Sequence, residues 1–175
     1  GGRWADANGS QFNGGSSFPM LASLSGVNLF TTGLEAGVIA PGSSSLRGFG
    51  TSAASKSRYD ALRKIESLDV GRSALIQAKN RITGAAIDNL SILNSALDAL
   101  PALTTVFPTS SLGKQLETVA RMIALRDVLG LKRQIFYCSL GGFDTHTNQL
   151  STQASLLETL DTALLAFHAA TVEMG

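Results

Sequence analysis

The chain has 175 residues, of which 44% are hydrophobic and 15% are charged, so one domain with a single hydrophobic core is expected. The 14 basic and 13 acidic residues leave a formal net charge of +1, and no run of Lys or Arg alternates with aromatic residues. Nucleic-acid binding is therefore not expected, because attraction to phosphates supplies most of the affinity of such proteins. No apolar run approaches the roughly 20 residues of a membrane helix, so a membrane span is not expected either.

Glycine, serine and asparagine are frequent in residues 1–50, where we expect many turns and little regular structure. Two short apolar segments bounded by turn residues, 19–25 and 37–40, predict two strands. Residues 3–6 are typical of the last turn of a helix that begins before the chain. Residues 42–50 predict a surface loop, because they lack the Gly-Lys-Ser/Thr ending of a phosphate-binding loop.

A helical pattern extends over residues 52–129, with breaks that divide it into three predicted helices. The first helix ends near Gly71, the second runs to Pro101, and the third is capped by Ser111 and ended by Gly130. We expect the three to pack as an antiparallel cluster. The first helix has an apolar stripe made of Tyr59, Leu62, Ile65 and Leu68. It also carries a basic group, expected to be a solvated face rather than an anion site, made of Lys56, Arg58, Arg63 and Lys64.

The apolar run at residues 134–140 is too short for a helix and too continuous for a half-exposed strand. It therefore predicts a strand covered on both faces by helices. Gly141 and Gly142 follow and predict a tight turn. Residues 149–171 predict a fourth helix, whose apolar face contains Leu150, Leu157, Leu160, Leu164 and Phe167. The strand, turn and helix over 134–171 put the turn at the carboxyl end of the strand, where open parallel sheets have their ligand crevices.

Asp144 and His146 in this turn are the residues best suited to chemistry. Side chains alternate between the two sides of an extended chain, so these two point the same way and Thr145 points the other way. A carboxylate oxygen and an imidazole nitrogen are both good ligands for zinc or a similar divalent ion. The alternatives are a turn or helix-capping role for Asp144 and a surface role for His146.

The remaining polar residues near this segment have weaker claims. The second histidine, His168, follows the apolar Phe167 and is expected on a helix surface. Gln149 and Gln153 lie four apart on the opening turns of the last helix, and we expect exposure or capping rather than contact with a crevice. Cys138 is the only cysteine, so no internal disulfide can form.

Residues 113–167 contain three segments that resemble the bacterial family called domain of unknown function 1501: Arg133-Gln-Ile-Phe, Ser139-Leu-Gly-Gly-Phe-Asp-Thr-His and Asn148-Gln-Leu-Ser-Thr-Gln. Earlier segments that begin at Gly2, Asn28 and Gly48 are also similar to the middle region of that family, so the resemblance covers essentially the whole chain. The family is related to the alkaline phosphatase and sulfatase superfamily. The resemblance implies a helix-rich, partial alkaline-phosphatase-like α/β domain with a few mostly parallel strands. It also implies an exported, periplasmic protein, since members commonly carry twin-arginine signals.

The same resemblance implies that Asp144 and His146 bind one metal ion of a centre that polarises a phosphate or sulfate ester. The superfamily also needs an early Asp beside a nucleophilic Ser or Thr, and a later Asp-His-Gly segment. This chain has neither at the expected places. We therefore expect it to contribute one ligand pair to a metal-dependent hydrolase and to be inactive by itself. The alternative is a non-catalytic helical scaffold or protein-interaction module.

The chain starts at Gly1 and stops at Gly175, directly after a predicted helix, which is typical of an excised piece. We expect a single incomplete domain over residues 1–175. Missing neighbours would leave the edges of the strand at 134–140 unpaired, so self-association or pairing with a partner chain is expected there.

Overall fold

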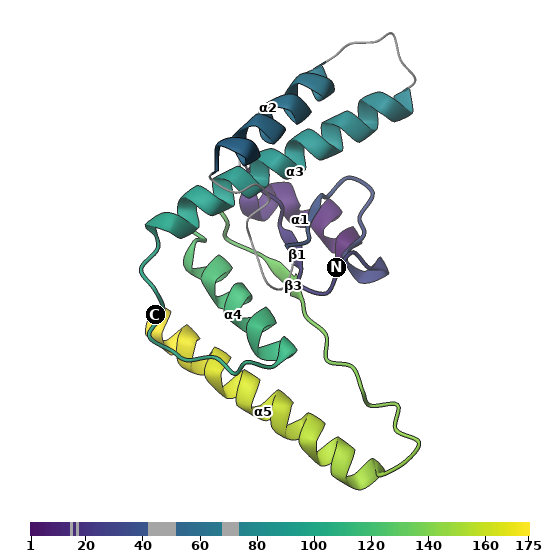
Figure 1. The fold of residues 1–175 in the computed structure, drawn as a ribbon, viewed down its shortest axis with the longest axis vertical. Coiled ribbons are helices and arrows are strands. Elements are labelled where there is room, and N and C mark those ends of the chain that lie inside the picture. The colour runs from purple at the N-terminus through teal and green to yellow at the C-terminus, as the bar shows by residue number, and fades with distance from the viewer. Residues whose placement is uncertain (15, 17, 42–51, 68–73) are drawn as a thin grey trace.

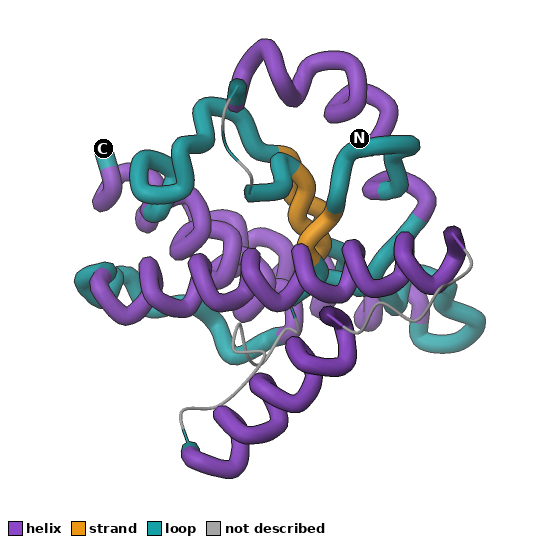
Figure 2. The backbone as a smooth tube through the Cα atoms, turned by 90° about the horizontal axis from the view of Figure 1, so that it is seen from above, coloured by secondary structure: helices purple, strands orange, loops and turns teal. Residues whose placement is uncertain are grey.

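The computed structural model describes residues 1–14, 16, 18–41, 52–67 and 74–175. Within these ranges it is a helix-rich α/β fold in which helices enclose a small parallel sheet (Figures 1 and 2). The elements in chain order are α1 (Gly2–Asn13), β1 (Leu21–Ser23), the 3-10 helix η1 (Leu29–Thr31), β2 (Val38–Ile39), α2 (Ala53–Ser67), α3 (Ala74–Ala99), α4 (Ser111–Ala124), β3 (Ile135–Tyr137) and α5 (Gln149–Met174). None of these helices combines the length and the apolarity needed to cross a bilayer.

The sheet has the strand order β2-β1-β3, and both pairings are parallel. The three strands predicted from apolar segments are thereby confirmed, although each is shorter than its segment. The central strand β1 is fully buried, whereas all three residues of β3 are only half-buried. Helices do cover both faces of β3, as predicted, since Ile135 packs with Ala5 of α1 and Phe136 packs with residues of α3 and α4. The strand is only half-buried because it lies at an edge of the sheet.

The backbone N–H and C=O groups of β3 point to both edges of the strand. The N–H of Ile135 donates to the carbonyl of Met20, and the carbonyl of Tyr137 accepts from the N–H of Leu24, so these two residues face β1. Phe136 lies between them and directs its own N–H and C=O to the opposite edge. No strand of the described part pairs with that edge. The prediction of unpaired edges therefore holds for one edge of β3 in the described part, whereas the other edge pairs with β1.

Each face of the sheet has its own hydrophobic cluster. Alternation along the strands places Leu21 with Val38 and Ile135 on one side, where they pack against Ala5 of α1. The other side contains Ala22, Ile39 and Phe136, which pack against residues of α3, of α4 and of the turns that follow α4. These residues are Leu93, Ala96, Leu97, Met122, Leu125, Leu129 and Leu131. The sheet is thus covered by α1 on one face and by α3 and α4 on the other.

Helix α1 corrects the prediction for residues 3–6. The helix begins at Gly2 and continues to Asn13, through Gly9 and Ser10, which have low helix propensity. Packing on the sheet outweighs that propensity, because Ala5 is buried there. Within the helix, Phe12 stacks on Trp4 with ring centroids 5.7 Å apart.

The four longer helices form two pairs, and not one antiparallel cluster of three. Helix α2 packs on α3, and α4 packs on α5, as Figure 1 shows at the top and the bottom of the molecule. Helix α4 is capped by Ser110, whose hydroxyl accepts from the N–H of Gly113, so the prediction of Ser111 was one residue late. It ends at Ala124, before Gly130, whose φ of 65° closes the turns that follow. The predicted break at Gly71 lies outside the described residues, as do the predicted loop at 42–50 and Leu68.

Candidate metal centre

Two buried amide side chains hold the chain on either side of β3. Before the strand, Asn13 donates to the carbonyl of Arg133 at 2.7 Å and accepts from the N–H groups of Lys132 and Arg133 at 2.8 and 2.9 Å. After the strand, Gln115 of α4 accepts from the N–H of Ser139 at 2.9 Å and donates to its carbonyl at 3.1 Å. These are the two hydrogen bonds that a neighbouring strand would make with the backbone of Ser139. Gln115 is only 3% exposed, so water cannot easily replace its amide there.

The first residues after β3 pack against the helices, and most of the residues that follow are exposed. Cys138 and Leu140 pack into a cluster with Leu112 and Leu116 of α4 and Ala163 of α5. Burial raises the pKa of the Cys138 thiol to about 11, which suits a packing role and not a reactive one. Beyond Leu140 the chain leaves the sheet and runs along the molecule to the start of α5, as Figure 1 shows.

Of Gly141 and Gly142, only the second has a conformation that favours glycine. Gly142 has a φ of 97°, and a Cβ there would lie 3.4 Å from a methyl group of Leu156 in α5. Gly141 is exposed and would meet nothing within 4 Å. The predicted tight strand-to-helix turn is therefore wrong, since a loop over residues 138–148 connects β3 to α5, and only Gly142 has a conformation that favours glycine.

Asp144 and His146 lie side by side on this loop. The carboxylate Oδ1 of Asp144 is 3.5 Å from Nε2 of His146, and the side chains are 93% and 86% exposed. The N–H of Thr145 donates to the carbonyl of Phe143 at 3.0 Å, which folds the backbone tightly around Asp144. The prediction that the two side chains share a direction is confirmed, and both are open to a ligand.

The surroundings of the pair differ from the prediction. The loop carries both residues away from the carboxyl ends of the strands (Figure 1), so the pair does not lie at the mouth of the sheet. Over the described ranges, no group of three or more His, Cys, Asp or Glu residues is arranged to hold a metal ion. His168 is exposed on α5, as predicted, about 28 Å along the helix from its first residue. It is therefore not a third ligand.

Of the two structural alternatives for Asp144, the turn role agrees with the tight turn that the Thr145–Phe143 hydrogen bond closes, whereas the helix-capping role gains no support from the start of α5. The cap residue of that helix is Asn148, in the left-handed region with a φ of 50°, and no side chain caps the first amides. Gln149 is exposed, as expected, and Gln153 is half-buried. One feature was missed from the sequence: the hydroxyl of Thr145 is buried, and in the described part it has no hydrogen-bond partner. No pattern in the sequence signals this.

The basic group of α2 faces solvent, as predicted for most of its members. Lys56, Arg58 and Lys64 are exposed, whereas the half-buried Arg63 lies 3.5 Å from both Glu66 and Asp88. A hollow of about 1030 Å³ between α2 and α3 is lined by these paired charges together with Arg81 and Asn80, among others. It contains no residue of the Asp144–His146 pair.

No family model, curated protein or solved structure matches this chain.

Proposed function

We propose that Asp144 and His146 form one ligand pair of a divalent-metal site, with zinc as the ion that suits the two donors best. In a tetrahedral zinc site with metal–ligand distances of about 2.0–2.1 Å, two donor atoms are about 3.4 Å apart. The 3.5 Å between Oδ1 and Nε2 is close to that edge. This single distance carries the proposal.

The pair supplies only part of a coordination shell. Zinc takes four ligands, so two further donors come from water, substrate or groups beyond these two side chains. The position of the metal site would be set by the residues that hold the start of the loop. Gln115 fixes Ser139, and Cys138 and Leu140 pack with residues of α4 and α5. The exposed carboxylate and imidazole then project from an anchored base.

The reaction class follows from the family resemblance. We propose that the complete, exported protein hydrolyses a phosphoric or sulfuric ester, and that this chain alone is inactive. When bound, the metal would polarise the ester and activate water. Asp144 and His146 would hold it, while the nucleophile and the second metal would be supplied from outside the pair.

The test is zinc binding by the 175-residue chain. Calorimetric titration should detect one weak zinc site, and replacing Asp144 and His146 by Ala should reduce its affinity by at least tenfold, about 1.4 kcal/mol. The control is His168→Ala, which removes the other histidine and should leave affinity unchanged. Equal zinc binding by the wild type and the double variant would exclude the proposed site. Hydrolysis of aryl phosphates and aryl sulfates, measured on the same samples with zinc, is expected to be absent.

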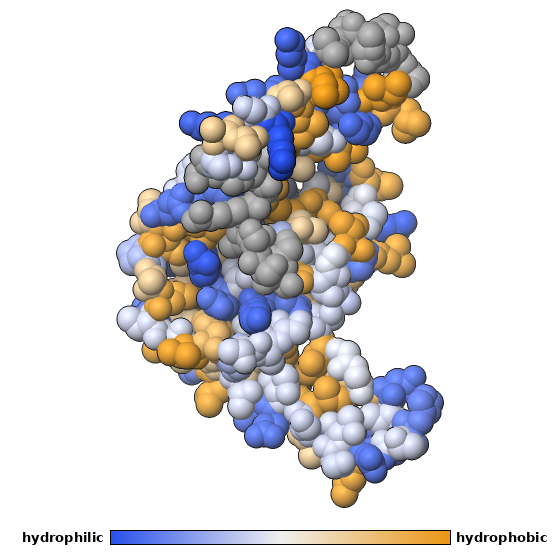
Figure 3. All heavy atoms as spheres, in the orientation of Figure 1, coloured by the Kyte–Doolittle hydropathy of each residue, from blue (hydrophilic) through white to orange (hydrophobic). Residues whose placement is uncertain are grey.

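A second candidate is a scaffold or protein-interaction module, and the exposure of large apolar side chains favours it. Leu75 and Ile82 of α3 are 79% and 68% exposed, and Leu150 of α5 is 90% exposed. Figure 3 shows apolar side chains at the surface around the α2–α3 pair. Contiguous apolar patches on a protein surface often mark contacts with other proteins. The zinc titration separates the two candidates, because a scaffold needs no ligand pair.

A further inference from the structure

Helix α5 has two apolar faces, and only one of them packs on another described element. The inner face packs on α4 through Leu160, Ala163 and Phe167, and Ala163 is fully buried. The opposite side carries eight residues that we call the outer stripe: Leu150, Ala154, Leu157, Asp161, Leu164, Leu165, His168 and Val172. At 100° per residue these eight lie within about one third of the helix circumference, turned away from Ala163.

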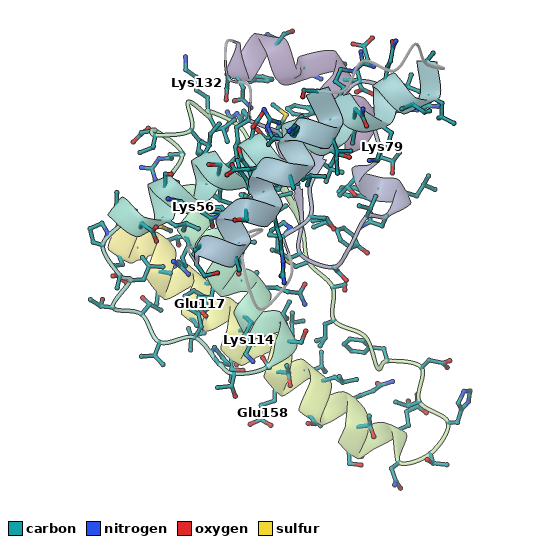
Figure 4. All side chains as sticks on the ribbon, turned by 45° about the horizontal axis from the view of Figure 1, so that its top comes forward. Lys56, Lys79, Lys114, Glu117, Lys132 and Glu158 are labelled. Atoms are coloured by element: carbon teal, nitrogen blue, oxygen red, sulfur yellow. The ribbon has the colours of Figure 1, made fainter. Side chains whose placement is uncertain are left out.

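The outer stripe is exposed along its whole length. Leu150, Leu157 and Leu164 are seven residues apart and are 90%, 55% and 48% exposed, while Leu165 and Val172 are 67% and 68% exposed. Leucines that recur every seven residues on one helix face are typical of a face that packs on another helix. Figures 1 and 4 show α5 at the outside of the molecule, and Glu158, beside the stripe, points away from α4. No described element covers this face.

The two polar residues of the stripe are placed so that a second copy of α5 can pair with them. Asp161 and His168 are both exposed, and neither side chain bonds to another described residue. They lie seven residues apart with Leu164 and Leu165 midway between them. Two copies of α5 that run antiparallel about a twofold axis at Leu164 and Leu165 therefore bring each Asp161 to the His168 of the second copy.

The same register satisfies the apolar residues. When Asp161 faces His168 of the second copy, Leu164 faces Leu165 and Leu157 faces Val172. Between residues 157 and 172 every contact then joins apolar to apolar or a carboxylate to an imidazole, which has an N–H to donate in either protonation state, and Leu150 lies outside this paired region. A twofold contact requires one surface to be complementary to itself, and the outer stripe has that property.

We infer that the outer stripe is a homodimer interface, in which two α5 helices pack antiparallel and are fixed in register by two Asp161–His168 contacts. This surface is distinct from the open edge of β3, and the inference does not depend on metal binding. A dimer of this kind accounts for a helix that is apolar on both sides although only one side packs against the residues that the structure describes.

Sedimentation velocity over a range of protein concentrations tests the interface. The wild-type chain should show a monomer–dimer equilibrium, and Leu164→Asp should make it monomeric. His168→Asp places carboxylates opposite each other twice and should weaken association at least tenfold. The double change Asp161→His with His168→Asp restores opposite partners and should return association to near the wild-type level. Leu75→Asp, the same kind of change at an exposed leucine of α3, is the matched control and should not alter it.

Circular dichroism of each variant checks that folding is retained, and the charge changes are at exposed positions. A wild-type chain that stays monomeric at every concentration overturns the inference. A dimer that persists in both Leu164→Asp and His168→Asp also overturns it, since another surface, such as the β3 edge, would then hold the two copies. Failure of the double change to restore association would refute the antiparallel register.

Discussion

Replacing Gln115 by Ala removes the side chain that stands in for a strand beside Ser139. The N–H and C=O of Ser139 would each lose their partner, at 2.9 and 3.1 Å in the native chain. A buried polar group left without a partner costs about 1–3 kcal/mol. Ser139 is half-buried, so water can bond to its freed groups and offset part of this cost. We expect a loss of about 2–4 kcal/mol, a fall in melting temperature of roughly 5–15 °C for a chain of this size.

Urea denaturation followed by circular dichroism measures this loss, with Lys114→Ala as the control. Lys114 is the preceding residue on α4, is exposed, and appears at the helix surface in Figure 4. The control should change stability by less than about 0.5 kcal/mol. Amide exchange at Ser139 should also become faster in Gln115→Ala, because the loop that carries Asp144 and His146 loses its anchor. A Gln115 variant as stable as the Lys114 variant would refute the view that this amide holds the loop.

Two further substitutions test the loop and the C-terminal end of α5. Gly142→Ala should cost about 1–2 kcal/mol, because its φ of 97° strains any residue with a Cβ, whereas Gly141→Ala should be neutral; equal stabilities in urea would contradict this. Glu173 accepts from the N–H of Thr104 and from the hydroxyl and N–H of Thr105, which lowers the pKa of its carboxyl from 4.5 to about 2. The stabilisation is thus present above about pH 4.5 and is lost as pH falls toward 2. The stability difference between the wild type and Glu173→Gln should shrink between pH 6 and pH 3, and a constant difference would contradict the assigned cause.

Helices with a strong apolar period were predictable from the sequence. The stretches that became α2, α3 and α4 carry apolar residues at helical spacing, and Pro101 follows closely on the end of α3. The three strands were also found, because breakers surround short apolar segments in each case. These patterns involve only residues near each other in the sequence, so they can be recognised without knowledge of the fold.

The parts that failed depend on distant contacts. Helix α1 has poor helix formers in its second half, and its stability comes from packing on a sheet whose third strand lies far along the chain. The half-exposure of β3 follows from its place at the sheet edge, which strand order decides and local sequence does not. The shared direction of Asp144 and His146 was predictable from their spacing, whereas their distance from the sheet depends on the path of the loop after Cys138 and Leu140, which pack with residues of α4 and α5.

Nuclear magnetic resonance of the two imidazole rings during a zinc titration tests the ligand pair most directly. The chain has only two histidines, and His168 on α5 serves as an internal reference. With Asp144 intact, the nitrogen-15 signal of His146 Nε2 should move to the position of a metal-bound nitrogen while both signals of His168 stay in place. Replacing Asp144 by Ala should reduce the shift at any given zinc concentration. Signals of His146 that do not move, or that move no more than those of His168, would contradict the proposed metal site.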